Sequence, residues 1–308
     1  MPLSDAETTM PAPGQRTAWT LLLLTVIFWG GNVVASRSAV GEVSPMALVT
    51  IRWGIVTLVM LAVCWRDCIR DWPVLRVHWL PILLMGFFGF TVYQALYFGA
   101  AHATSGVHLA ILQGVAPAFI LAGAWIFYGT PIGLVRALGL GLTMLAVAVV
   151  ATHGEPQHII GMELNIGDIA MLVASFFYAA YAVALRGRPP VSALVFFTAL
   201  SAIAAITSTP LLAVEMWLGH AQWPTMKGWI VMSYIIVFPS LLAQVFFIRA
   251  VAMIGPGRAS LFYNLVPVLG AIMAVTLLGE PFAPYHATGL ALALGGVLIA
   301  EIFGGRTL

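Results

Sequence analysis

Residues 94–131 read QALYFGAAHATSGVHLAILQGVAPAFILAGAWIFYGTP, and this stretch decides the fold because it occurs twice. It aligns without a gap to residues 244–281, which read QVFFIRAVAMIGPGRASLFYNLVPVLGAIMAVTLLGEP. Glutamine meets glutamine at the start, and Pro117 meets Pro267. An internal repeat governs how the rest of a chain is interpreted. The duplication predicts two related halves.

The composition excludes an ordinary water-soluble domain. Of the 308 residues, 61% are apolar and 8% are charged, whereas a soluble domain has about 25% charged residues. Such a chain belongs in a bilayer, where about 20 consecutive apolar residues cross the hydrocarbon as a helix. A net charge of +2 gives no indication of a nucleic-acid partner. We expect the lipid bilayer and a small-molecule substrate as partners, and no cofactor.

Apolar runs predict an all-α integral membrane protein with ten transmembrane helices. The expected spans are about 17–37, 44–65, 78–100, 104–127, 132–152, 166–186, 192–214, 228–250, 256–278 and 284–303. We therefore expect a cytoplasmic tail (1–16), a first five-helix repeat (17–152), an extracytoplasmic connecting loop (153–165), a second five-helix repeat (166–303) and a short cytoplasmic tail (304–308).

The basic residues predict the orientation, because cytoplasmic ends of spans carry the excess of Lys and Arg. With the N-terminus inside, ten of the 13 basic residues fall at inner ends: Arg16, Arg66, Arg70, Arg76, Arg136, Arg186, Arg188, Arg249, Arg258 and Arg306. Two fall at outer ends, Arg37 and Lys227, and Arg52 lies within a span. The chain is thus expected in the inner membrane with both termini cytoplasmic.

An odd number of spans per half means that the second copy enters the bilayer from the opposite side, so the repeat is inverted. Inverted repeats are typical of secondary transporters, because two halves that exchange shapes give inward-open and outward-open states around one site. A membrane-embedded transferase would need convergent His, Asp or Glu side chains at one depth, and none is visible in the sequence. The pattern therefore favours a transporter over an enzyme.

Four side-chain amides lie inside the expected spans and are candidates for substrate binding: Gln94, Gln113, Gln244 and Asn264. A polar group that faces lipid is costly, so each is expected to face a cavity or another helix. Hydrogen bonding between helices is the alternative role.

Pro117 and Pro267 follow two of these amides inside the fourth and ninth expected spans. Proline removes a backbone donor and kinks a helix, which frees a carbonyl one turn earlier. The two prolines are therefore predicted to be hinges of a gating motion. A packing kink without a ligand is the alternative.

Arg52 lies about 12 Å from the outer end of its span, where a cation costs roughly 3 kcal/mol or more on insertion scales. It needs a partner. Asn32, Asp168 and the carboxylate of a bound substrate are the candidates, and a structural pair remains the alternative to substrate binding.

Aromatic side chains are dense within the spans. Those singled out as lining a pocket with a few polar anchors are Trp29, Tyr93, Tyr97, Tyr178, Tyr181 and Tyr263. The first tyrosine pair is spaced by four and the second by three, so each pair shares a helix face. Packing or membrane-belt roles are the alternative.

His108 occupies the position where the second copy has Arg258. A histidine near an interface can titrate and couple proton movement to transport, although hydrogen bonding at the interface is the simpler role. The expected connecting loop carries His153, Glu155, His158 and Glu163, but their spacing matches no closed zinc motif, and no metal site is expected.

Short motifs in order resemble the ten-helix drug/metabolite transporter superfamily. They are Trp29-Gly30-Gly31-Asn32, Pro45 followed by Arg52, the mid-span prolines, and Gly279-Glu280-Pro281, which resembles the EamA branch. The likeness covers residues 17–303. The first copy departs from the family pattern, because Thr130 stands where a glutamate is common, and we expect Glu280 to make a contact at a helix end or loop.

The overall pattern is similar to the YddG-type amino-acid exporters. The resemblance implies export of amino acids or related metabolites by alternating access, with spans one to four and six to nine around a central cavity and spans five and ten outside it. Glycines 139, 141, 289, 295 and 296 agree with close packing of that outer pair. Efflux of aromatic cations or drugs is the alternative, since aromatic faces suffice for it.

Overall fold

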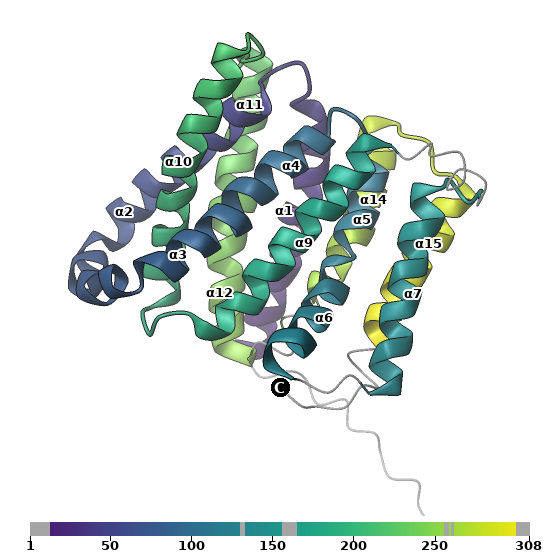
Figure 1. Cartoon of the computed structure of the whole chain (residues 1–308), viewed down its shortest axis with the longest axis horizontal. Helices are drawn as coiled ribbons and strands as arrows, with labels where there is room; N and C mark the ends of the chain where they lie inside the picture. Colours follow the sequence, from purple (N-terminus) through teal and green to yellow (C-terminus); the bar gives the residue numbers. More distant parts are fainter. Residues whose placement is uncertain (1–12, 130–132, 156–164, 256–258, 260–261, 300–308) are drawn as a thin grey trace, which may run out of the picture.

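The computed structural model describes residues 13–129, 133–155, 165–255, 259 and 262–299. These residues form helices and connections with no strand among them (Figure 1). The helices up to residue 151 are α1 (Pro13–Ser38), α2 (Pro45–Val77), α3 (Trp79–Gly86), η1 (Phe87–Val92), α4 (Tyr93–Ala100), α5 (Gly106–Gln113), α6 (Ala116–Tyr128) and α7 (Leu134–Ala151). Those that follow are α9 (Ile166–Ala184), η2 (Leu185–Gly187), α10 (Ala193–Trp217), α11 (Met226–Ile235), η3 (Ile236–Leu242), α12 (Ala243–Ile254), α14 (Leu265–Leu278) and α15 (Pro284–Leu298).

Within the described part of the chain, seven helical segments are long and apolar enough to cross a membrane. They cover residues 16–38, 45–77, 79–100, 106–128, 166–187, 193–217 and 226–254. Two further apolar helices are shorter, at residues 137–151 and 265–278. The prediction of an all-helical membrane protein is confirmed.

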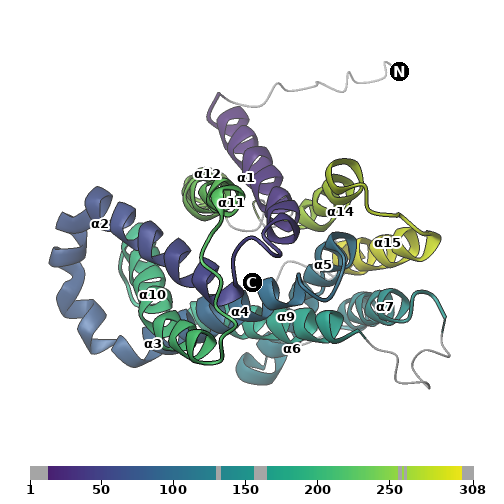
Figure 2. The ribbon, with the colours of Figure 1, turned by 90° about the horizontal axis from the view of Figure 1, so that it is seen from above.

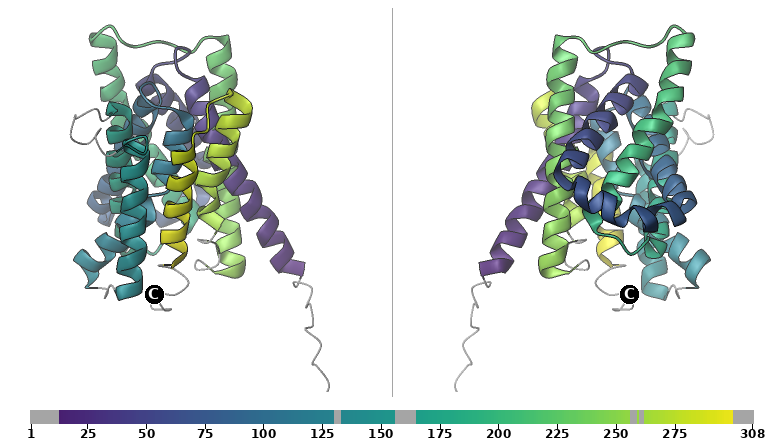
Figure 3. Two further views of the ribbon diagram at one scale, coloured as in Figure 1. Left: turned by 90° about the vertical axis from the view of Figure 1, so that its right-hand side faces the viewer. Right: turned by 90° about the vertical axis from the view of Figure 1, so that its left-hand side faces the viewer.

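The first and last described helices run in opposite directions. The start of α1 and the end of α15 lie at the same end of the bundle (Figure 3). The connections α1–α2, α4–α5, α10–α11 and α14–α15 lie at the opposite end, called here the upper end (Figure 1). An even number of crossings brings both chain ends to one side.

α2 is longer than the sequence predicted. The expected span stopped near residue 65, but the helix continues to Val77 after a kink at Cys64, whose backbone has φ −125° and ψ 26°. This continuation carries charged residues beside exposed Trp65 and Trp72. Tryptophan with neighbouring charges is favoured at a membrane–water boundary, so the polar residues did not end the helix.

The two copies of the repeat end corresponding helices in the same way. α6 stops at Gly129 with φ 62°, and α14 stops at Gly279 with φ 69°. A left-handed residue closes many helices, and glycine adopts this conformation without a Cβ penalty. The shared glycine thus explains why both helices stop at equivalent positions.

Both helices that carry the mid-span prolines are interrupted just before them. α5 ends at Gln113 and α6 begins at Ala116, while Asn264 is a turn residue ahead of α14. The two interruptions touch, because a Cβ added to Gly114 would lie 3.0 Å from Pro267 Cγ. The predicted bends are confirmed, and their action as hinges stays a prediction.

Two π-helical segments, η1 and η3, occupy corresponding places in the two copies. In the alignment that places position 94 on position 244, residues 87–92 correspond to residues 237–242, which lie within η3. The wide turn of η1 brings Gly89 against the Tyr181 ring, where an added Cβ would lie 2.4 Å from the ring. π-Segments of this kind often occur at functional sites. The sequence analysis did not predict them.

α7 and α15 form a pair at one edge of the bundle, opposite the edge made by α2, α3 and α10 (Figure 2). A Cβ added to Gly296 would lie 2.5 Å from the Gly139 carbonyl oxygen, and one added to Gly289 would lie 2.3 Å from a Val150 methyl. Close packing of this outer pair through these three glycines is confirmed. Gly141 and Gly295 have open space around them, so their predicted packing role is wrong.

Gly296→Ala is expected to lower stability, because the new methyl group would meet a backbone carbonyl that cannot rotate away. Overpacking of this kind costs about 1–3 kcal/mol. Gly295→Ala is the matched control, since its methyl enters open space and alanine favours a helix over glycine. Thermal unfolding of both purified variants measures the difference. Equal midpoints would contradict the packing described for α7 and α15.

Candidate functional site

Arg52 of α2 is the buried cation at the middle of the bundle, with 4% of its surface exposed. Its Nε donates to Ser240 Oγ of η3 at 2.7 Å, and its Nη1 donates to Gln94 Oε1 of α4 at 2.8 Å. The guanidinium also lies 4.9 Å from the Trp53 ring centroid. The site is therefore built where α4 and the π-helical segment η3 approach α2.

The predicted protein partners of Arg52 are wrong. Asp168 lies near the upper end, where it contacts α5, and Asn32 is not hydrogen-bonded to Arg52. Among the described residues, no carboxylate pairs with Arg52. Gln94 had been named for its depth alone, and Ser240 was missed because nothing in the local pattern marks a serine inside an apolar run. A buried arginine served only by neutral groups keeps an uncompensated charge.

Polar atoms without partners lie close to this arginine. Tyr97, which is 1% exposed, has a buried hydroxyl beside Asn32 and Ser36, but the geometry of a hydrogen bond is not met. Asn32 Oδ1 is also buried, without a hydrogen-bond partner among the described residues. Leaving such groups unpaired costs about 1–3 kcal/mol each, so a ligand that paired with them would recover free energy.

The aromatic residues singled out from the sequence form a continuous chain of rings across the bundle. Successive centroids are separated by 5.6, 6.3, 5.2 and 5.9 Å, in the order Trp29, Tyr263, Tyr178, Tyr93 and Tyr97. Tyr181 joins the chain through Tyr178 at 5.9 Å. The pairs predicted to share a helix face do so, and separations of this size are typical of attractive aromatic pairs.

This aromatic chain retains accessible surface. Tyr93, Tyr178 and Tyr263 are partly exposed although they belong to helices in the middle of the bundle. Trp29 donates from Nε1 to the Pro239 carbonyl oxygen in η3 at 3.1 Å. Partly exposed tyrosines near a buried cation give a mostly apolar wall with a few polar anchors, which is the usual composition of a small-molecule site.

The other three predicted amides, Gln113, Gln244 and Asn264, lie in different surroundings. Gln113, at the end of α5, contacts the Tyr263 phenol and so joins the aromatic chain. Asn264 is buried and follows that tyrosine directly. Gln244 of α12 is half-buried, and its repeat partner Gln94 holds the arginine. Equivalent positions of the two copies thus have different neighbours.

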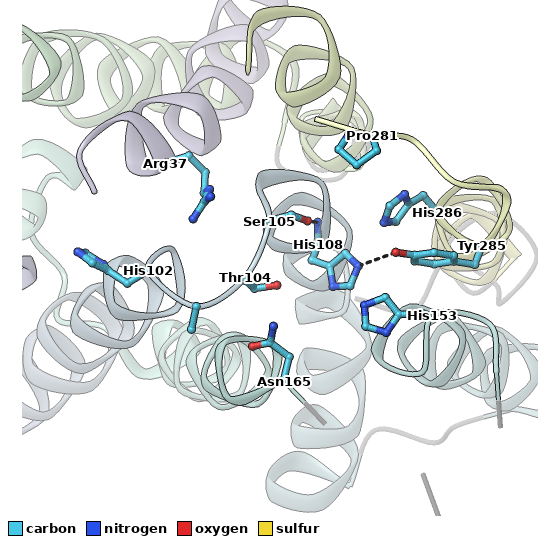
Figure 4. A pocket seen from close by; sticks show the side chains of 11 residues that line it. Arg37, His102, Thr104, Ser105, His108, His153, Asn165, Pro281, Tyr285 and His286 are labelled. Carbon is cyan, nitrogen blue, oxygen red and sulfur yellow. Dashed lines mark hydrogen bonds between the residues drawn. The ribbon is translucent and has the colours of Figure 1, made fainter. Parts of the chain in front are cut away.

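A second group of polar residues lies at the upper end (Figure 4). His108 Nδ1 contacts both carboxylate oxygens of Asp168, at 3.1 and 3.0 Å. Its Nε2 lies 3.4 Å from the Tyr285 hydroxyl of α15. The sequence analysis named His108 and Asp168 separately and missed their pairing, because the two residues come from different helices.

Glu280 closes the start of α5. Its two carboxylate oxygens accept from the Gly106 and Val107 backbone N–H groups, each at 2.9 Å, and Arg37 lies 3.5 Å away. The free N–H groups and the helix dipole favour an anion at this place. The predicted helix-end contact of Glu280 is confirmed.

The structure describes only part of the expected connecting loop (153–165), in which no metal site is expected. His158 and Glu163 lie outside the described residues. Among the residues that the structure does describe, no group of three or more His, Cys, Asp or Glu side chains is arranged to hold a metal ion.

Comparison with known proteins supports both the repeat and the membrane assignment. A Bacillus subtilis protein, "Uncharacterized transporter YyaM", is 25% identical, with 92% of this chain and 93% of that protein covered. An "Uncharacterized transporter" of Archaeoglobus fulgidus is also 25% identical, covering 91% and 97%. A crystal structure with 18% identity, covering 95% of this chain and 100% of the other, has the same fold with a TM-score of 0.63.

The model of the EamA-like transporter family matches twice, at residues 16–152 and 165–301. These segments coincide with the two halves of the repeat, and together they contain both the Arg52 site and the upper-end cluster. The chain is accordingly a multi-pass membrane transporter and belongs to the EamA-like transporter family.

Proposed function

We propose that this chain exports amino acids, or related small zwitterionic metabolites, across the inner membrane by alternating access. The proposal includes ten transmembrane helices arranged as two inverted five-helix repeats, with both termini cytoplasmic. Arg52 would bind the substrate carboxylate, the neighbouring amides and hydroxyls its other polar groups, and the aromatic chain its side chain.

The observation that carries the proposal is the uncompensated charge of Arg52. Its two hydrogen-bond acceptors, Gln94 and Ser240, are neutral. A guanidinium presents five N–H donors in a planar fork that matches a carboxylate. Two of these donors are used in the hydrogen bonds from Nε and Nη1, which leaves other N–H donors of the guanidinium for a ligand. An anionic group in the substrate would therefore neutralise the charge during transport.

The surroundings favour a zwitterion over a larger anion. Phosphate or nucleotide-sugar substrates would call for several cationic side chains, whereas Arg52 is the buried arginine among the described core residues. Partly exposed tyrosines beside it supply apolar faces and phenol oxygens. An ammonium group is attracted to such faces by cation–π interaction, so both ends of an amino acid would find complementary groups.

Alternating access is supported by the paired structural features of the two copies. The interruptions at residues 114–115 and at Asn264 face one another through Gly114 and Pro267. Symmetry-related breaks beside a central site are what inverted-repeat carriers use to change which side is open. The common end of α1 and α15 agrees with an even number of crossings (Figure 3).

Efflux of aromatic cations is the second candidate, and the aromatic chain is the observation that favours it. Arg52 weighs against it, because a permanent cation would meet a like charge in a region of low dielectric. Among the described residues at the aromatic chain, none is acidic. Amino acids are therefore the better match.

The test is a substrate panel on the full chain in proteoliposomes. Exchange of radiolabelled methionine is measured with unlabelled competitors, and methionine is compared with methioninamide, which keeps the side chain and the amine but lacks the carboxylate. We expect methionine and threonine to compete and the amide to fail. Competition by organic cations such as tetraphenylphosphonium, with none from methionine or threonine, would overturn the amino-acid proposal.

The orientation gives a separate prediction. In a background where Cys64 and Cys68 are replaced by alanine, Lys227→Cys should react with a membrane-impermeant maleimide added outside the cell. Arg188→Cys should react only after the membrane is permeabilised. Both parent side chains are exposed, so access depends on the side of the membrane. The reverse pattern would contradict cytoplasmic termini.

A further inference from the structure

We propose that His108, Asp168 and Tyr285 form a proton-binding site, and that the proton bound there is the ion coupled to substrate export. The coupling rests on the proposed function, whereas proton binding at the upper end does not. The site lies beside a cavity of about 370 Å³ at the upper end of the bundle (Figure 4). The cavity is lined by residues of five separate parts of the chain, among them Arg37, His102, His108, His153, Asn165 and Tyr285.

Geometry fixes which nitrogen of His108 takes up the proton. A carboxylate cannot donate, so Nδ1 carries a hydrogen and donates to Asp168, whose side chain is 2% exposed. Nε2 is therefore the nitrogen that can accept a further proton. In the neutral ring it accepts from the Tyr285 hydroxyl, and after protonation it donates to the same oxygen. One proton can therefore be added without displacing either neighbour.

The charge of the pair changes with that proton. With His108 neutral, Asp168 is a buried anion supported by His108 Nδ1–H and by the hydroxyl of Thr104. With His108 protonated, the pair is neutral overall. Burying an uncompensated carboxylate is far more costly than burying a hydrogen-bonded ion pair. The proton consequently favours an arrangement of the upper end in which His108 and Asp168 stay paired and buried, called here the closed arrangement.

The other charged groups around the pair do not supply the missing charge. Those that face His108 from the elements packed on it are Arg37 of α1, His102 of the α4–α5 connection, His153 after α7, Glu280 of the α14–α15 connection, and Tyr285 and His286 of α15. Arg37 and Glu280 pair with each other. His286 Nδ1 accepts from the Ala283 N–H group, so that ring is neutral in this arrangement. The net charge of the cluster is therefore decided by the histidine protons, and His108 is the histidine held against the carboxylate.

The sequence places this chemistry in one half only. Position 258, the repeat equivalent of His108, is an arginine, which stays charged at all physiological pH values. One copy therefore carries a side chain that can gain a proton, and the other carries a fixed charge. Proton binding from the outside would close the upper end after substrate release and return the carrier to its inward-open state.

The first experiment measures closure of the upper end without any substrate. Ala103→Cys, in the background lacking Cys64 and Cys68, places a thiol on the cavity lining. Its maleimide reactivity is compared between variants at the same pH, which cancels the titration of the thiol itself. We expect His108→Gln to react at least about tenfold faster than its parent near pH 5.5, since about 1.4 kcal/mol corresponds to tenfold. The two should converge at alkaline pH.

Asp168→Asn gives the opposite sign and keeps the test valid if His108→Gln fails to fold. Removing the buried negative charge removes the need for a proton, so this variant should react slowly at both pH values. His220→Gln is the matched control, because it is an exposed histidine at the same end of the bundle. Reactivity that follows the parent at every pH in both the His108 and Asp168 variants would overturn the proton site.

The second experiment measures coupling. Vesicles loaded with radiolabelled substrate are placed in acid or neutral medium, and efflux is compared with exchange at equal pH. We expect acid outside to speed efflux by the full chain and by His220→Gln, while His108→Gln retains exchange and loses the acid stimulation. Exchange with no acid effect in the full chain would overturn the coupling and leave the export function standing. Failure of every amino acid to move, with pH-dependent labelling intact, would instead overturn the export function and the coupling that rests on it.

Discussion

Arg52→Met should weaken substrate binding by at least about tenfold while leaving the stability of the protein close to that of the parent. The guanidinium is buried, and no carboxylate among the described residues forms an ion pair with it. Its hydrogen bonds to Ser240 and Gln94 are 2.7 and 2.8 Å long. Losing a charged hydrogen bond to the substrate carboxylate costs about 1.5–3 kcal/mol, which corresponds to roughly 10–150-fold in affinity. Bidentate pairing would raise that loss further. Binding is measured by scintillation proximity with labelled methionine.

Stability distinguishes this role from a structural one. Arg52→Met removes an uncompensated buried charge, which is itself costly, but leaves Gln94 Oε1 without this donor, at about 1–3 kcal/mol. The two effects oppose each other, so the thermal midpoint of Arg52→Met should stay close to that of the parent. Arg52→Lys keeps the charge but cannot reach both acceptors with a planar fork, and it should recover only part of the binding. Arg66→Ala, an exposed arginine on the same helix, is the matched control. Unchanged affinity together with a large fall in the midpoint would assign Arg52 to packing.

Much of the fold follows from local pattern. Long apolar runs placed the helices, because a membrane segment must satisfy its backbone within one helix. The spacing of Tyr93 with Tyr97, and of Tyr178 with Tyr181, predicted shared faces that the ring contacts confirm. Mid-span prolines predicted the bends. Each of these inferences depends on residues within a few turns of one another.

The parts that escaped prediction involve partners from distant helices. Ser240 holds Arg52 because a π-helical segment turns it inward, where its hydroxyl also bonds the Ile235 carbonyl. No local composition specifies that wide turn. Likewise, His108 and Asp168 were each noticed, but their contact depends on how α5 packs on α9. The polarity of residues 66–77 led to a predicted span that ended near residue 65. In the structure, α2 continues through these residues to Val77.

Glu280→Gln should loosen the upper end, and the expected size of the effect follows from three contacts. The carboxylate accepts from two backbone N–H groups at the start of α5 and faces Arg37. A glutamine has one acceptor oxygen, so at least one charge-assisted bond is lost, at about 1.5–3 kcal/mol. The interaction of the anion with the helix dipole is lost as well. We expect a lower thermal midpoint and faster labelling of Ala103→Cys.

The control for this variant is Glu42→Gln at the same end of the bundle. Thr225 and Lys227 hold the pKa of the Glu42 carboxyl below its usual range. Lys227 is exposed, so water screens this ion pair and its loss should change little. Equal effects of the two substitutions would contradict a closing role for Glu280. A fall in substrate affinity without loss of stability would instead place Glu280 at the substrate. Thr130 occupies the equivalent position in the first copy, so the repeat does not duplicate this carboxylate, and Glu280→Gln tests a contact that the sequence of one copy alone provides.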